Sequence, residues 1–181
     1  EVSEKDLRSL AEKTQFLWNI NTLDDPYLSQ ELTHLKNSDV FILDNLNVKG
    51  FIASVEKPRD LKIVNTEEKA GIDLFVNGRL RETNILRHMS TFSTRIVASY
   101  LYGQIHFNDL DDAGDDSFTT SRESVKEGNK KYENLLSVLK EKVLENISNT
   151  WDKWRLDAKE EGDDENPRKS KKERRAGSLY N

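Results

Sequence analysis

The chain has 181 residues, a formal net charge of −5, 35% hydrophobic residues, 34% charged residues and no cysteine. This length suits one domain with its own core, and so many charges predict that part of the chain is exposed. Without cysteine, disulfides, thiol nucleophiles and cysteine-based zinc or iron–sulfur sites are excluded. The negative charge does not favour general nucleic-acid binding, and no apolar run reaches the roughly 20 residues that cross a bilayer.

Residues 1–37 are predicted to form an N-terminal helical segment. Leu7, Leu10, Leu17 and Trp18 recur at helical spacing, so a helix is expected from residue 1 to residue 23, with Trp18 in the core. A second, short helix is expected after Pro26, because proline fits a first helical turn. The chain opens without methionine and already in helix-like sequence, which suggests a piece of a longer protein.

Residues 38–156 are predicted to form an α/β (α+β) domain on a small mixed sheet of about four strands. The expected strands are residues 40–43, 48–55, 71–76 and 95–107, the last as a central strand because its middle is nearly continuously apolar. Asn77-Gly78 is a strong turn signal, and the helical spacing after it predicts a helix over 80–89 rather than a hairpin. A long C-terminal helix is expected over 129–156.

Residues 157–181 are predicted to be a charged, disordered tail or a linker. The apolar pattern stops there, and an acidic block at 160–165 precedes a basic block at 168–175. A nucleic-acid contact through the basic block is a weaker alternative.

The chain carries none of the familiar enzyme signatures. It has no glycine-rich phosphate loop, no GxSxG and no HExxH, and His34, His88 and His106 lie far apart. The acidic run from Asp109 to Asp116 lacks the alternation of a helix–loop–helix calcium site, so we interpret it as a solvated loop and predict no metal site.

Arg122 stands out among the charged residues. Thr120 and Glu123 have capping-box spacing, so a helix is predicted to begin near them, where a cation is electrostatically unfavourable. Arginine beside free backbone N–H groups suits an anion, phosphate above all. The alternative is that Arg122 pairs with the acidic loop or with Glu123.

Here the sequence resembles a known superfamily. The run YLYGQIHFNDLDD followed by SFTTSRESV is similar to the segment after the nucleotide-binding domain of GHKL ATPases, both the HSP90-like chaperones and bacterial MORC-like proteins. The MORC-like similarity extends over roughly residues 40–154 and includes Gly50-Phe51-Ile52, Lys57-Pro58 and Asn77-Gly78-Arg79. The chain departs from the chaperone pattern, which has a glutamine where Lys126 or Glu127 stands.

The resemblance implies a transducer domain with a left-handed βαβ crossover, in a cytoplasmic ATPase. In that reading Arg122 contacts the γ-phosphate of ATP, Thr120, Ser121 and Glu123 support it, and Lys57 and Arg79 are second candidates. ATP and magnesium belong to the parent protein, and its N-terminal ATP-binding domain is the expected partner. With no nucleotide-binding domain here, this chain by itself is expected to bind no cofactor and to hydrolyse no ATP.

Two other functions stay open from the residues alone. The chain could be a protein-interaction or homodimerisation module, with Trp18, Trp151 and Trp154 as interface anchors. It could also contact nucleic acid through the basic block. A membrane partner is not expected.

Overall fold

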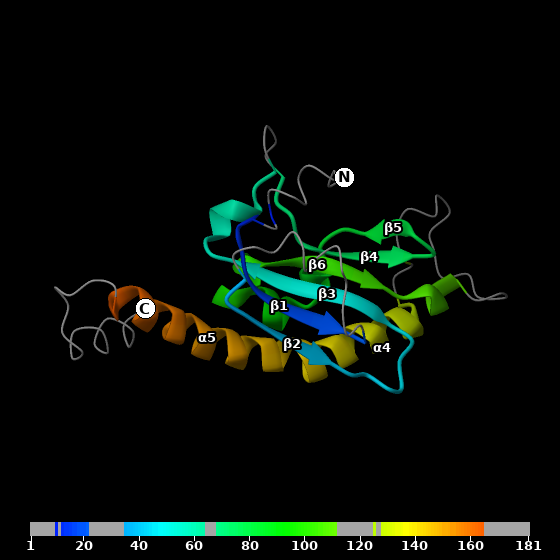
Figure 1. The fold of residues 1–181 in the computed structure, drawn as a ribbon. Coiled ribbons are helices and arrows are strands. Elements are labelled where there is room, and N and C mark those ends of the chain that lie inside the picture. Colours follow the sequence, from blue (N-terminus) through cyan, green and yellow to red (C-terminus); the bar gives the residue numbers. More distant parts are fainter. Residues whose placement is uncertain are drawn as a thin grey trace.

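A mixed sheet of six strands forms the centre of the molecule (Figure 1). The computed structural model describes residues 10, 12–21, 35–63, 68–111, 125 and 128–164, with side chains described as far as residue 160. The strands are β1 (Thr14–Ile20), β2 (Asn37–Phe41), β3 (Lys49–Val55), β4 (Ile72–Val76), β5 (Arg79–Glu82) and β6 (Leu101–His106). The α/β class is confirmed, with six strands in place of the four expected.

The strand order across the sheet is β2-β1-β3-β6-β4-β5. β1 pairs in parallel with β2 and antiparallel with β3, and β6 pairs antiparallel with β3 and in parallel with β4. A parallel pair requires a crossover, and residues 77–100 supply the one between β4 and β6. That this crossover is left-handed stays a prediction.

The helix expected over residues 14–20 is wrong, because this segment is β1 in the interior of the sheet. Phe16, Trp18 and Ile20 lie in the main core, whereas Leu17 packs in a cluster on the other face. This period of two is the strand signature. Phe16 and Ile20 do not fit the helical stripe, but together with Trp18 they alternate as the buried residues of a strand do. Residues 14–20 therefore belong to the sheet and not to a separate helical segment.

The helix expected after Asn77-Gly78 is also wrong. Asn77 and Gly78 have φ angles of 51° and 78°, as a two-residue hairpin turn requires, and β5 folds back antiparallel onto β4. Residues 85–88 form a short 3-10 helix (η2, Ile85–His88), followed by α3 (Ser90–Ser93). The Asn77-Gly78 turn therefore leads into a strand, although the residues after it have helical spacing.

The strand expected over 95–107 is confirmed only from Leu101 to His106. Residues 96–100 form a 3-10 helix (η3, Ile96–Tyr100), in which Ile96 is 67% exposed and Val97 is 2% exposed. The central position of β6 between β3 and β4 is confirmed. β3 and β6 approach closely, since a Cβ added to Gly50 would lie 2.0 Å from the carbonyl oxygen of Gln104.

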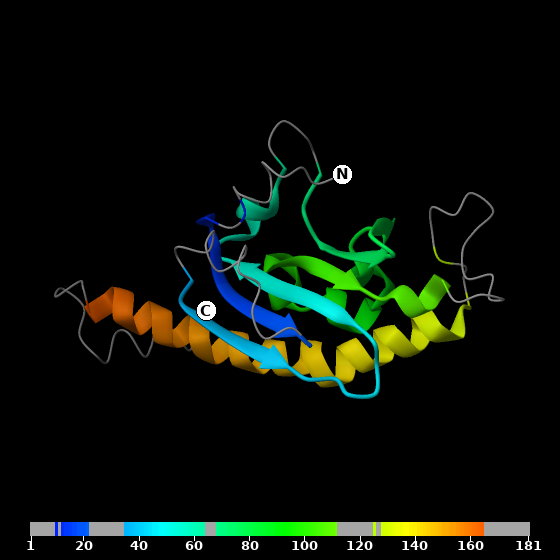
Figure 2. The same ribbon diagram turned by 45° about the vertical axis from the view of Figure 1, so that its right-hand side comes forward.

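A single long helical rod covers one face of the sheet (Figures 1 and 2). It consists of α4 (Lys130–Val138), a π-helical turn (η5, Leu139–Leu144) and α5 (Glu145–Asp164). The long helix is therefore confirmed, but the tail predicted from residue 157 is wrong as far as Asp164, which is helical. Within the described ranges, no helix is both long and apolar enough to cross a membrane.

The three tryptophans belong to the packing between the rod and the sheet. Trp18 of β1 is fully buried and stacks on Trp154 of α5, with ring centroids 5.4 Å apart and an interplanar angle of 5°. Trp151 is 3% exposed, and Trp154 is half-buried against the same core. Trp18 and Trp151 are buried inside the domain and offer no surface to a partner, which contradicts their expected role as interface anchors.

A smaller cluster packs on the other face, at the end of the sheet where β1 and β6 begin. The Thr14 and Tyr102 hydroxyls lie 2.6 Å apart, and the Thr14 hydroxyl also donates to the carbonyl of Leu10 at 2.8 Å. Burial raises the pKa of Tyr102 to about 12, so the phenol stays protonated. These contacts fix the start of β1 against the start of β6, beside the turn that carries Lys57.

Candidate functional site

The first-ranked site residues lie outside the described residues. These are Arg122 and its supporting residues Thr120, Ser121 and Glu123, and their roles stay predictions. The next described residue along the chain is Val125, which is buried and whose backbone N–H donates to Glu82 Oε1 at 2.9 Å. Val125 thus lies in the body of the domain beside the edge strand β5.

Glu82 is a buried carboxylate that the sequence reasoning missed. It is 4% exposed, and its Oε2 accepts a hydrogen bond from Arg87 Nη2 at 2.6 Å while Oε1 binds Val125. Both oxygens therefore have partners, which a buried charge requires. The alternation of Arg79-Leu80-Arg81-Glu82 could have placed Glu82 on one face, had the hairpin been recognised.

Replacing Glu82 by alanine should destabilise the domain by about 2 kcal/mol, because a buried N–H loses its acceptor and Arg87 loses its partner. Chemical denaturation followed by circular dichroism measures this loss. Glu141→Ala is the matched control, since Glu141 is exposed on the helical rod. Equal stability of the two variants would show that the contacts of Glu82 contribute nothing.

Arg79 lies at the acidic end of the sheet. It is exposed, opens β5 and pairs across the hairpin with Val76. The preceding Asn77 is held by η4 (Asn108–Asp111), because its backbone N–H donates to Asn108 Oδ1 at 2.7 Å and its Nδ2 to Asp111 Oδ2 at 3.0 Å.

The two described aspartates of the acidic run, Asp109 and Asp111, accept hydrogen bonds from neighbouring turns. Besides the contact of Asp111 with Asn77, Asp109 accepts a hydrogen bond from Asn47 Nδ2 at 3.4 Å. Among the described residues, no group of three or more His, Cys, Asp or Glu side chains could hold a metal ion. Asp112, Asp115 and Asp116 lie outside the described residues.

Lys57 lies in a tightly held turn directly after β3. The 3-10 helix η1 (Pro58–Leu61) begins at the next residue, and proline at this position suits a helix start. The Lys57 backbone N–H donates to Asp60 Oδ2 at 3.2 Å, and the Asp60 N–H donates to the Lys57 carbonyl at 2.9 Å. The backbone is thus fixed while the side chain is exposed, and no described carboxylate lies within ion-pair distance of its ammonium.

The structure separates the two second-ranked candidates. Lys57 follows the end of β3, where Ser54 pairs with Leu101 at the start of β6. Arg79 follows the end of β4, where Phe75 pairs with His106 at the end of β6. The six residues of β6 lie between these two ends and span roughly 20 Å. Lys57 and Arg79 therefore cannot contact the same phosphate group.

The two described histidines have local packing partners, and His34 lies outside the described residues. His88 Nδ1 lies 2.6 Å from the Tyr132 hydroxyl, and burial together with nearby Glu82 raises the pKa of Tyr132. His106 stacks on Phe75 with centroids 5.0 Å apart, and burial lowers its pKa. The raised pKa of Tyr132 keeps its phenol protonated beside His88, and the contact of His106 with Phe75 is an aromatic one.

No family model matches the chain, and no solved structure matches it. The chain is similar to a protein of Herpetosiphon aurantiacus named "Putative type II restriction enzyme HgiDII", with 30% identity over 157 residues. The aligned region covers 82% of this chain and 24% of that protein. This chain therefore resembles, over most of its own length, about a quarter of a much longer protein.

Proposed function

We propose that the chain is the transducer domain of a cytoplasmic GHKL-type ATPase, which couples ATP binding and hydrolysis in another domain to conformational change. In this function a cation of the transducer contacts the γ-phosphate, and ATP and magnesium are bound by the N-terminal ATP-binding domain. Three features support the proposal: the sequence resemblance, the parallel β4–β6 pair with its crossover, and similarity to a quarter of a longer protein.

One observation carries the proposal furthest, namely the geometry of Lys57. Its main chain is fixed by Pro58 and by the two hydrogen bonds with Asp60, whereas its ammonium is exposed and has no ionic partner among the described side chains. A fixed backbone reduces the entropy lost when the side chain meets an anion. Lys57 is therefore a candidate for the phosphate contact alongside Arg122, and Arg79 lies at the opposite end of the sheet from Lys57.

Steady-state ATP turnover of the full-length protein tests the proposal. Arg122→Ala or Lys57→Ala should lower turnover about tenfold or more, equivalent to about 1.4 kcal/mol of lost transition-state stabilisation. Arg122→Lys should recover activity only partly, since lysine lacks the bidentate fork. Melting temperatures should hardly change for Lys57→Ala, because an exposed side chain contributes little to packing.

Lys62→Ala provides the matched control, since Lys62 is exposed and lies just beyond the same turn. Its turnover should equal that of the wild type. The proposal fails if both Lys57→Ala and Arg122→Ala leave turnover unchanged, or if the purified full-length protein has no ATPase activity.

A second candidate follows from the name of the similar protein, which describes a restriction enzyme. The domain would then contact DNA, with the basic block at residues 168–175 as the contact, although that block lies outside the described residues. Retention on DNA that falls steeply with salt, and that is lost when residues 165–181 are deleted, would favour this candidate. Retention that is independent of the basic block would exclude it.

A further inference from the structure

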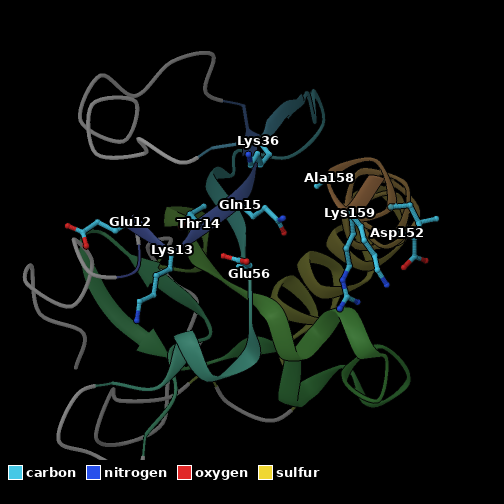
Figure 3. Close-up of a pocket in the computed structure, with 11 residues that line it drawn as sticks. Glu12, Lys13, Thr14, Gln15, Lys36, Glu56, Asp152, Ala158 and Lys159 are labelled. Atoms are coloured by element: carbon cyan, nitrogen blue, oxygen red, sulfur yellow. The ribbon is translucent and has the colours of Figure 1, made fainter. Parts of the chain in front are cut away.

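A cleft of about 1160 Å³ opens between the sheet and the C-terminal half of α5 (Figure 3). Gln15 of β1 and Glu56, directly after β3, come from the sheet side, and Lys159 comes from the helix on the other side. Arg155 and Leu156 also line it from the helix. A cleft of this volume can hold a small organic molecule, and Arg79 is not among the described residues that line it.

Arg155 is held in place by two aromatic rings. Its guanidinium lies over the rings of Trp151 and Tyr100, at 4.8 Å and 5.0 Å from their centroids, and its Nη2 donates to the Tyr100 hydroxyl at 3.2 Å. The two rings orient the guanidinium plane without neutralising its charge. The single hydrogen bond to Tyr100 uses one of five N–H donors, so most of the fork is left for a ligand.

Lys159 adds a second cation to this wall. It lies one helical turn after Arg155, on the same side of α5, and both side chains are half-buried. Among the described side chains, neither cation is within ion-pair distance of a carboxylate. Two half-buried like charges one turn apart repel each other, and Asp152, which also lines the cleft three residues before Arg155, forms no ion pair with either of them. A bound anion removes that repulsion.

The opposite wall restricts the kind of anion. The sheet side is mixed in charge, since it is lined by Lys13 and Lys36 as well as by Glu12 and Glu56. The Glu56 carboxylate and the Gln15 amide oxygen can accept hydrogen bonds from a donor group. The cleft therefore suits a ligand with an anionic group at one end and hydrogen-bond donors at the other. A phosphate fits two cations better than a carboxylate does, because it carries more charge and more acceptor oxygens.

From these contacts we infer that the cleft binds a phosphate group that belongs to a ligand with hydrogen-bond donors, such as a nucleotide. Arg155 and Lys159 hold the phosphate, and Gln15 and Glu56 face the other end of the ligand. A free nucleotide and a nucleotide within single-stranded DNA present the same chemistry. This inference is independent of the γ-phosphate contact proposed above, which involves different residues.

Tryptophan fluorescence of the 181-residue chain offers a direct test, because all three tryptophans belong to the cluster beside Arg155. The probes are adenosine monophosphate, a short single-stranded oligonucleotide and inorganic phosphate, with a glutamate-rich peptide as the carboxylate comparison. Saturable binding of adenosine monophosphate or the oligonucleotide, tighter than that of inorganic phosphate, supports the inference. The tighter of these two probes identifies the source of the phosphate.

Variants locate the binding. Lys159→Gln should weaken it about tenfold, since removing one charge-assisted contact costs roughly 1.4 kcal/mol. Arg155→Gln should do the same or more, and Lys159→Gln keeps the test valid if loss of the Arg155 ring contacts destabilises the fold. Lys153→Gln is the matched control, because Lys153 is exposed on α5 and does not line the cleft.

The inference is overturned if neither nucleotide probe binds saturably to the folded chain. It is also overturned if the glutamate-rich peptide binds more tightly than both nucleotide probes, or if Lys153→Gln weakens binding as much as Lys159→Gln does.

Discussion

Trp18→Ala should lower the free energy of unfolding by about 4 kcal/mol, the range in which buried aromatic truncations fall. Trp18 is fully buried, stacks on Trp154 and meets the edge of Phe16 at a centroid distance of 6.2 Å. Its loss leaves a cavity between β1 and α5 that this packing cannot fill. Because a domain of this size is stable by only about 5–15 kcal/mol, the variant should be close to unfolding at physiological temperature.

Urea denaturation measures this loss, and Trp18→Phe is the informative comparison. The indole Nε1 of Trp18 is buried and has no hydrogen-bond partner in the described part of the structure. Phenylalanine removes that unsatisfied donor and keeps most of the ring, so it should cost far less than alanine. An alanine variant as stable as the wild type would mean that β1 does not pack against α5 in solution.

Val97→Asp should cost about 3 kcal/mol or more, because it places a carboxylate without a partner in an apolar environment. Val97 is the buried residue of η3, which leads into the central strand β6. We expect a lower melting temperature or loss of soluble protein.

Ile96→Asp is the matched control for Val97→Asp. Ile96 is the adjacent residue and is 67% exposed, so the same substitution there should change stability by less than about 0.5 kcal/mol. If both aspartate variants melt at the wild-type temperature, the burial assigned to η3 is wrong.

Lys57 and Arg122 are both candidates for the phosphate contact of the proposed transducer domain. Lys57 comes two residues after Val55, which pairs with Thr14 at the start of β1, whereas Val125 donates a hydrogen bond to Glu82 of the edge strand β5. Combining Lys57→Ala with Arg122→Ala in one protein tests whether the two cations contribute to the same phosphate contact. The double variant therefore reports whether the two act together: losses that multiply indicate independent contacts.

Elements with a strong local signal could be predicted from the sequence. Residues 49–55 and 72–76 are short, β-rich apolar runs bounded by turn residues, and both are strands. The stripe from Tyr132 to Trp154 is long enough to identify a helix without ambiguity, and it lies in one helical rod. The α/β class followed from these elements alone.

Elements with two competing local signals could not be predicted from the sequence. Residues 14–20 satisfy a helical stripe through Leu17 and a period of two through Phe16, Trp18 and Ile20, and only pairing with β2 and β3 selects the strand. Likewise, Arg79–Glu82 becomes a strand because β4 offers an edge to pair with. Backbone hydrogen bonds to a neighbouring strand are long-range, so no local pattern contains them.

For the function, the sequence by itself determined which residue types are present: the Ser121-Arg122-Glu123 tripeptide, the Lys57-Pro58 pair and the lack of cysteine. Only the tertiary structure determined which charged side chains lie close together in space. It separated Lys57 from Arg79 by the length of β6, buried Glu82 beneath Val125, and placed Arg155 on two aromatic rings, one of them more than 50 residues away in the chain. The physical reason is that ligand contacts depend on distance in space, which strand pairing and core packing set over long sequence separations.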